Sequence, residues 1–304
     1  MHVFQGAWKR REVDWPDAPE QVRLLIEARK SAAHARLSLQ RQNWQGAIGN
    51  WSGAGIGSSI DFQDHRPYLP GDDPRYIDWA AYARSGHYIM KLYREEVSPK
   101  VDVILDVSRS MIWNEEKRTR VLELLFFCVE SGLGSGATVK VYGIVGNQWR
   151  HHGVEVLLAG RLVPPEFTTD GLPPDVTSLP LQSGSLRILI SDLLYDVSPH
   201  SLLRALSAAR GRVSMLTPYS ADEENPSWRG NVELLDCEIG RGRRQRVDAD
   251  ILKRYVSAYR GHFASWRDAT RRYDARMARV PAHGSLSDAL RGEAITSGVV
   301  EAWT

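Results

Sequence analysis

Apolar and polar positions between residues 100 and 280 alternate between strand-like and helix-like segments. Near-continuous runs of Val, Ile and Leu, typical of strands covered on both faces, occur four times: 101–108, 137–146, 186–192 and 212–219. Two shorter apolar runs also predict strands, at 153–160 and 231–240. Segments with helical spacing lie between strands, at 115–132 and 198–211. This alternation predicts an α/β fold in which a doubly wound, mostly parallel sheet has helices on both faces.

The first 99 residues are predicted to form a structured preamble packed on this core. Residues 20–42 carry apolar side chains at helical spacing, and the Gly- and Ser-rich stretch 46–59 cannot continue that helix. Residues 60–100 are dense in Pro, Gly, aromatic and charged residues, with one strand-like piece at 88–97. The predicted organisation therefore has three parts: an N-terminal segment 1–99, an α/β domain 100–280 and a C-terminal tail 281–304.

A long amphipathic helix is predicted from about Asp248 to Arg279. Apolar side chains recur along it every three or four residues: Leu252, Tyr255, Tyr259, Phe263 and Trp266. The other face is strongly basic, because residues 241–279 contain twelve Lys or Arg and four Asp. A solvated surface is the ordinary explanation of such a face, and an acidic partner or nucleic acid is the alternative.

Composition limits the classes of partner and compartment. Lys and Arg total 39 against 37 Asp and Glu, a formal net charge of +2, so the whole chain does not favour a polyanionic partner and nucleic acid is not expected. No apolar stretch approaches the roughly 20 residues that span a bilayer, and the N-terminus has no signal-peptide core. We therefore expect a cytoplasmic protein with free thiols at Cys128 and Cys237.

Candidate chemistry lies at the ends of two predicted strands. The first strand ends in "DVSRSM", which presents Asp106, Ser108 and Ser110 at alternate positions, and a later strand ends at Asp192. The carboxyl ends of parallel strands meet at one edge of a sheet, and carboxylate and hydroxyl oxygens suit Mg²⁺. The pattern therefore predicts an incomplete cation site with an open position for an outside ligand. Helix capping is the simpler explanation of Asp106 and the serines taken alone.

Three enzymatic interpretations of the same strand end lack a necessary residue. A haloacid-dehalogenase-type phosphatase needs a second Asp at position 108, which is Ser. No GxSxG string stands where a nucleophile elbow requires it. Neither "GAGIGSS" nor "GLGSGAT" ends in the Lys-Ser/Thr of a phosphate-binding loop. Nucleotide hydrolysis by this chain is therefore not expected.

Two stretches resemble a known family. "DVSRSM" followed by "ILISD" resembles the metal-ion-dependent adhesion site of von Willebrand factor A domains, and "RPYLPGDDPRYIDW" resembles the signature of MoxR-associated proteins of domain-of-unknown-function family 58. The resemblance, which runs from about residue 20 to 280, implies these metal ligands: Asp106, Ser108, Ser110, Asp192 and a loop Thr. Thr169 is the best match for that Thr, with Thr168 and Thr177 behind it. The family's following helix is replaced by "GLPPDVTSLPLQSGS", which predicts weak metal affinity or a vestigial site.

The resemblance implies a von Willebrand factor A-like fold and a non-enzymatic adaptor. Bound Mg²⁺ or Mn²⁺ would accept a carboxylate from a partner, and the implied partner is a MoxR-type AAA+ ATPase. The pair would act as a chaperone in the assembly or maturation of other proteins. The alternative is a metal-dependent hydrolase of phosphoesters, with Asp106 and Asp192 as nucleophile and general acid, although the sequence supplies no matching Lys.

The preamble concentrates opposite charges between two turns fixed by Pro and Gly. Five charged residues lie within thirteen positions: Arg66, Asp72, Asp73, Arg75 and Asp78. Opposite charges this close are expected to pair, so a structural brace of Arg and Asp is the first interpretation. The functional alternative is that these residues form a docking surface for the partner ATPase.

Overall fold

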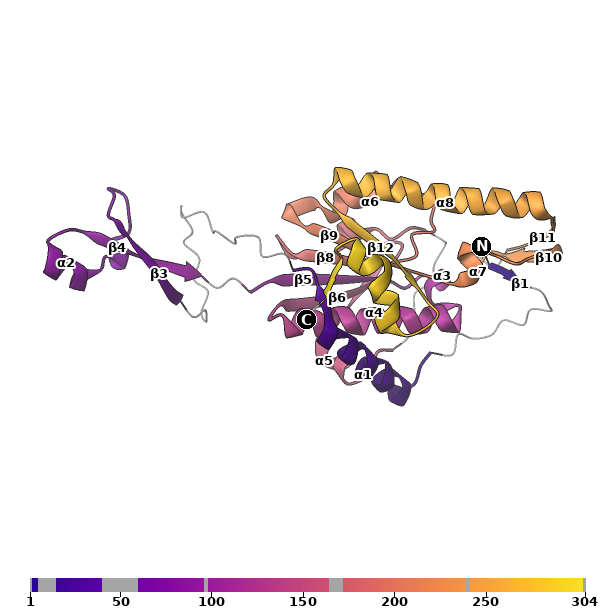
Figure 1. Cartoon of the computed structure of the whole chain (residues 1–304), viewed down its shortest axis with the longest axis horizontal. Coiled ribbons are helices and arrows are strands. Elements are labelled where there is room, and N and C mark those ends of the chain that lie inside the picture. Colours follow the sequence, from indigo (N-terminus) through magenta and orange to yellow (C-terminus); the bar gives the residue numbers. More distant parts are fainter. Residues whose placement is uncertain are drawn as a thin grey trace. The chain divides into compact units, whose positions relative to one another are not determined.

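The computed structural model (Figure 1) describes most of the chain, in six stretches: 2–4, 15–39, 60–95, 98–163, 172–238 and 241–302. The predicted loop 46–59 lies outside the described residues. Contacts divide the chain into two compact units, one of Met1–Leu39 with Pro99–Thr304 and one of Gln40–Ser98. This division differs from the predicted one, because residues 15–39 belong to the larger unit rather than to a separate N-terminal segment.

The larger unit is built on a sheet with six strands among the described residues, in the order β12-β9-β8-β5-β6-β7. The bounds are β5 Lys100–Asp106, β6 Thr138–Val145, β7 Gln148–His152, β8 Leu186–Ile190, β9 Arg212–Tyr219 and β12 Arg276–Pro281. All pairs are parallel except β6 with β7. The predicted doubly wound, mostly parallel α/β sheet is therefore confirmed.

Alternate strand residues build two separate cores, because successive side chains of a strand point to opposite faces. Val103 and Leu105 of β5 belong to one core, and Ile104 belongs to the other. The first core contains residues of α1 (Ala18–His34), α4 (Glu115–Gly134) and α9 (Leu286–Ala289). The second contains residues of α6 (Pro199–Leu206) and α8 (Ala249–Arg272). The sheet is thus covered on both faces, as Figure 1 shows.

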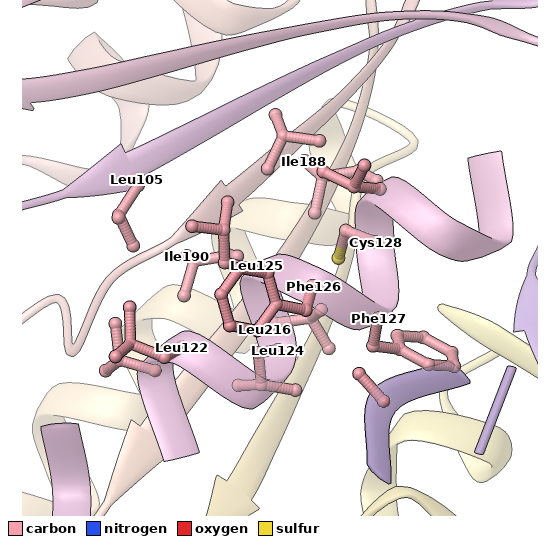
Figure 2. Packing of buried hydrophobic residues seen from close by; sticks show 14 of the residues in the cluster. Leu105, Leu122, Leu124, Leu125, Phe126, Phe127, Cys128, Ile188, Ile190 and Leu216 are labelled. Carbon is pink, nitrogen blue, oxygen red and sulfur yellow. The ribbon is translucent and has the colours of Figure 1, made fainter. Parts of the chain in front are cut away.

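The helix α4 is buried around most of its circumference. Asn114 caps it by accepting a hydrogen bond from the Lys117 amide at 3.0 Å. Figure 2 shows its apolar side chains against those of three strands: Leu122, Leu124, Leu125, Phe126, Phe127 and Cys128 of α4, with Leu105, Ile188, Ile190 and Leu216. Cys128 and Cys237 are both buried and free, as expected. Within the described residues, no helix is long and apolar enough to span a membrane.

The predicted strand at 153–160 is wrong, because this segment forms the short helix α5 (Val154–Leu158). A short apolar run fits a strand and a buried helical turn equally well. The strand that pairs with β6 is instead the preceding β7, whose residues are mostly exposed. A polar edge strand carries no apolar signal by which the sequence could reveal it.

The predicted C-terminal helix ends seven residues early. Asp248 caps α8 as expected, but the helix stops at Arg272, and Asp274 takes the left-handed conformation with φ 49°. Residues 276–281 form β12, the sixth strand of the sheet, with Met277, Ala278 and Val280 buried. Arginines at 276 and 279 concealed this strand within the basic helical pattern.

Residues 281–304, expected as a tail, are packed structure over most of their length. They form α9, a short helical turn η4 (Leu290–Ala294) and β13 (Val300–Ala302), which pairs with β2 (Ala35–Leu37). Several of their side chains are buried: Leu286, Ala289, Leu290, Ala294, Val299 and Val300. The C-terminal segment therefore completes the core beneath α1 and α4.

The predicted strand at 231–240 belongs to a second, antiparallel sheet of the larger unit. That sheet has the order β1-β10-β11, with β1 His2–Phe4, β10 Gly230–Leu235 and β11 Gly242–Val247. The short helices of this unit are α3 Arg109–Ile112, α7 Ala221–Glu224, η2 Val176–Ser178 and η3 Ala208–Arg210. Val232, Leu234 and Val247 of the small sheet pack against Trp228, Ile251 and Leu252.

The smaller unit is a β-hairpin with a helix. The strands β3 (Ile60–Pro67) and β4 (Ile89–Glu95) pair antiparallel, and the strand predicted at 88–97 is thus confirmed. Between them lie a 3₁₀ turn η1 (Pro74–Tyr76) and α2 (Trp79–Ser85). Tyr82 stacks on Tyr88 with ring centroids 4.6 Å apart.

The packing of the C-terminal segment can be tested at two adjacent residues. Leu290 is 1% exposed, and the side chain of Arg291 is 71% exposed. We expect Leu290→Ala to lower the free energy of unfolding by about 2–5 kcal/mol, because it leaves a cavity in the core. Arg291→Ala should change it by less than ~0.5 kcal/mol. Urea unfolding measures both, and equal effects would show that this segment does not complete the core.

Candidate functional site

The candidate site lies where the order of strand addition reverses. The strand β5 has β6 on one side and β8 on the other, so connections leave β5 in opposite directions and open a crevice at the carboxyl edge. Asp106 is the last residue of β5, and Asp192 lies two residues beyond β8. They are 1% and 3% exposed. The topology therefore places both predicted carboxylates at one edge of the sheet.

The turn after β5 brings the two predicted serines to these carboxylates. Asp106 Oδ1 accepts a hydrogen bond from the Ser108 amide at 3.0 Å, and Asp106 Oδ2 accepts one from the Ser191 hydroxyl at 2.7 Å. The hydroxyls of Ser108 and Ser110 are 3.1 Å apart, and the Ser110 side chain helps to lower the pKa of Asp192. Four of the five predicted metal ligands are thus connected. Ser108 precedes α3, but its hydroxyl makes no capping bond, so helix capping does not account for it.

Sequence reasoning missed a buried lysine at the centre of the site. Lys117, in the first turn of α4, is fully buried, and its Nζ lies 2.8 Å from Asp192 Oδ2 and 2.7 Å from Glu223 Oε1. The signal was its position, since Lys117 continues a stripe of buried residues four and seven positions later, Val121 and Leu124. The charged run "NEEKRTR" concealed this, because such runs usually mark an exposed helix start.

The two strand-end carboxylates have opposite electrostatic environments. Burial and, to a smaller extent, the neighbouring charge of Asp192 together raise the pKa of Asp106 to about 6, against the opposing effect of the hydrogen bonds from Ser191 and Ser108. Burial also opposes ionisation of Asp192, but the Lys117 ammonium outweighs it and lowers that pKa below its ordinary value. Lys117 is desolvated too, yet Asp192 and Glu223 keep its pKa above that of an exposed lysine. Asp192 is therefore ionised at neutral pH, whereas the raised pKa of Asp106 places its change of protonation state closer to neutral pH.

These groups lie in an acidic cavity of about 610 Å³. Its rim carries Asp196, Asp236 and Glu238, and one wall is formed by Tyr255 and Tyr259 of α8. The Glu238 carboxylate, from the loop between β10 and β11, accepts hydrogen bonds from the amides of Ser110 at 2.8 Å and Arg109 at 3.3 Å. The small sheet thus reaches the carboxyl edge of the main sheet through this loop.

The oxygen atoms at the site suit a hard divalent cation that is bound by serine hydroxyls as well as by carboxylates. When ionised, the three carboxylates of Asp106, Asp192 and Glu223 outnumber the one ammonium of Lys117, and two positive charges would balance them. Among the described residues, no group of three or more His, Cys, Asp and Glu side chains is arranged so that it could hold a metal ion. A cation here would therefore need the oxygens of Ser108 and Ser110.

The predicted loop ligand is not placed at the site. Thr169 and the neighbouring Thr168 lie outside the described residues. Thr177 lies on η2, where its hydroxyl donates to Asp175 at 2.5 Å, and it does not line the acidic cavity. The "GLPPDVTSLPLQSGS" segment contains η2 and no longer helix in its described part. The Thr ligand stays a prediction.

Comparison with known families shows which family the chain belongs to. Residues 64–265 match the family described as "Protein of unknown function DUF58". The chain belongs to the DUF58 family. Its six-stranded sheet and long helix α8 are those of a von Willebrand factor A-like fold, as the resemblance implied.

Individual relatives of this DUF58 chain include uncharacterized proteins of Mycobacterium bovis and Mycobacterium tuberculosis. Each is 25% identical over 264 residues, which cover 81% of this chain and 83% of the relative. Among solved structures, BatB from Bacteroides thetaiotaomicron matches with a TM-score of 0.38 at 13% identity, over 66% of this chain and 98% of BatB. An aerotolerance-related membrane protein from Bacteroides fragilis matches with a TM-score of 0.31 at 11% identity, over 58% and 99%.

In the smaller unit, the five predicted partner-binding residues bond within the unit. Arg66 makes a two-pronged contact with Asp72, with both N–O distances 2.7 Å, and Arg75 bonds to Asp73 at 2.6 Å. Asp78 caps α2 by accepting from the amides of residues 80 and 81. The brace interpretation describes these contacts, and the docking role stays a prediction.

Replacement of Lys117 by Met should destabilise the DUF58 chain by about 3–5 kcal/mol at pH 7–8, because two buried carboxylates lose their cation. The loss should shrink toward pH 4, since burial then raises the Asp192 pKa and protonation removes the unpaired charge. Urea unfolding across this pH range measures the difference. Lys30→Met, at an exposed position of α1, is the matched control. A loss that stays constant with pH would contradict the assigned pairing.

Because the pKa of Asp106 is raised, the free energy of unfolding should depend on pH when EDTA keeps divalent cations away from the site. Its folded pKa of about 6 exceeds the ~3.9 of an unfolded Asp, so ionisation opposes folding. The favourable contribution is complete below about pH 4 and is lost as the pH rises through 6, a change of ~3 kcal/mol. Asp106→Asn should remove this part of the pH profile, and the exposed Asp222→Asn should retain it. If the Asp106→Asn variant keeps the wild-type dependence of unfolding free energy on pH, the assignment of that dependence to Asp106 is wrong.

Proposed function

We propose that this DUF58 chain is a non-enzymatic protein-binding module that uses a divalent cation, Mg²⁺ or Mn²⁺. Asp106, Ser108, Ser110 and Asp192 would hold the cation, and a carboxylate of a partner protein would complete its shell. The observation that supports the proposal is the convergence of these four side chains at one acidic cavity. Chemically, the cation would supply a positive charge to a cavity whose lining carries several carboxylates and hydroxyls.

The state of Asp106 supports a cation at this position. Within the described residues, no ammonium or guanidinium group bonds to Asp106, although Asp192 beside it is paired with Lys117. A buried carboxylate without a cation is costly, and a hard cation is the group that relieves that cost. Ser108 and Ser110 add oxygens without adding charge, so that the bound ion would still favour an anionic ligand.

The surroundings of Lys117 favour binding over hydrolysis. The alternative function, a metal-dependent phosphoesterase, lacked a Lys in the sequence pattern, and Lys117 now stands at the site. Its ammonium is fully buried and bonded to two carboxylates, so it is not presented to a substrate. A screen of generic phosphoesters with Mg²⁺ or Mn²⁺ tests the alternative, and turnover that disappears in Asp106→Asn would establish the hydrolase instead.

For the partner, we propose a MoxR-type AAA+ ATPase in the cytoplasm, on the basis of the resemblance of the "RPYLPGDDPRYIDW" stretch to MoxR-associated proteins. Membership of the DUF58 family supports this choice. In this arrangement the ATPase supplies the carboxylate that completes the cation's shell and hydrolyses ATP, and the pair assists the assembly or maturation of a client protein.

The binding function can be tested by co-precipitation with the MoxR-type ATPase of the same genome in ATP and Mg²⁺. We expect Ser108→Ala with Ser110→Ala to weaken the complex by about tenfold or more, a loss of ~1.4 kcal/mol, because two oxygens of the cation site are removed. Ser183→Ala with Ser201→Ala, at exposed positions away from the cavity, should leave binding unchanged.

Chelation alone is not decisive, because EDTA also strips Mg²⁺ from the nucleotide of the ATPase. A thermal shift of the isolated DUF58 chain separates the two effects: Mg²⁺ should stabilise the wild type and fail to stabilise the double Ser variant. Binding to the ATPase that is equal in the wild type and this variant would reject the cation-bridged module.

A further inference from the structure

A second cavity lies on the other side of α8. It is a groove of about 540 Å³ between the chain that follows α7 and the first three turns of α8. We name it the basic groove. Its cationic residues are Arg229, Lys253 and Arg260, and its apolar residues include Pro226, Leu252 and Val256. Tyr255, Tyr259 and His262 of the same helix line the acidic cavity, so α8 separates two surfaces of opposite charge.

The walls of the basic groove are fixed by packing. The Tyr255 hydroxyl donates to the carbonyl oxygen of Glu223 at 2.8 Å, which ties α7 to α8. Trp228 packs on Tyr255 with ring centroids 5.5 Å apart, and Leu252 packs with the core of the small sheet. A ligand would therefore enter a largely preformed groove and would not have to order it, which lowers the entropic cost of binding.

The lining of the basic groove is positively charged. None of its lining residues is acidic. Lys253 and Arg260 lie seven residues apart on one face of α8, are exposed, and have no carboxylate within ion-pair distance in the described part of the chain. Arg271 on the same helix differs, because it pairs with Asp268 at 3.2 Å. A cationic rim over a partly buried apolar floor of Leu252 and Val256 is more specific than a solvated basic face.

We propose that the basic groove binds an acidic peptide segment of a partner protein, with Glu or Asp side chains against Arg229, Lys253 and Arg260 and an apolar side chain on Leu252 and Val256. Charge complementarity identifies the occupant as anionic. The apolar floor favours a peptide over nucleic acid, because the lining contains no aromatic ring on which a base could stack. This site is separate from the proposed cation site and does not rest on it.

The test is fluorescence anisotropy of the full chain with a short labelled peptide of Glu and Leu. Lys253→Glu with Arg260→Glu should weaken binding by about tenfold or more, because two attractions become repulsions. Arg161→Glu with Arg204→Glu changes the net charge equally at exposed positions outside the groove and should change affinity less than about twofold. Asp106→Asn should leave this binding unchanged, which distinguishes it from the cation site.

Two further probes identify the class of ligand. A peptide of Glu and Ser should bind more weakly than the peptide of Glu and Leu, and Val256→Ser should reduce that preference. Labelled oligothymidylate should bind more weakly than the acidic peptide and fail to displace it. Equal loss of peptide binding in the groove variant and the charge-matched control, or tighter binding of the oligonucleotide, would overturn the proposal.

Discussion

The buried ion pairs of Lys117 hold the carboxyl edge of the sheet together. One ammonium bonds to Asp192, beyond β8, and to Glu223 of α7, and thereby joins α4 on one face of the sheet to the segment that leads into α8 on the other. Glu223 extends the connection, since its carboxylate also accepts from the Ser220 amide and its carbonyl oxygen from Tyr255. Without this charge, three carboxylates that are buried away from water would repel each other. The site geometry therefore depends on a residue outside the family motif.

This pairing makes the two strand-end carboxylates unequal. Lys117 pairs with Asp192, whereas the hydrogen bonds that Asp106 accepts from the described residues come from Ser108 and Ser191. A stability requirement alone would favour an apolar residue at a buried strand end with no cation. The retention of an acid that burial makes costly is typical of a functional position, because perturbed carboxylates gather at binding and catalytic sites. The asymmetry also separates their environments: Asp192 is held by Lys117, and Asp106 has no comparable cation among the described residues.

The main sheet and the strand-end positions of Asp106 and Asp192 could be predicted from the sequence, because both leave strong local patterns. Apolar runs marked β5, β6, β8 and β9, and the rule that ligands gather at the carboxyl ends of parallel strands placed Asp106 and Asp192 at one edge of the sheet. The edge strands β7 and β12 were missed because their polar and Arg-rich residues lack that apolar signal. Lys117 was missed because it stands in a charged run. Glu223 and Glu238 were missed because they are distant in sequence, 106 residues from Lys117 and 128 residues from Ser110 respectively, and only tertiary packing brings them to the site.

The same limit applies to charge, because a sum over the chain removes the information that a surface contains. A net charge of +2 predicted no strongly charged partner, yet α8 separates a cavity rimmed by Asp196, Asp236 and Glu238 from a groove rimmed by Arg229, Lys253 and Arg260. At physiological ionic strength, charges act over about 8 Å, so a partner senses each surface separately. Such a bipolar arrangement selects a partner by the spacing of its charges more than by their total. A near-neutral sum over the chain therefore does not exclude two locally charged surfaces on opposite sides of α8.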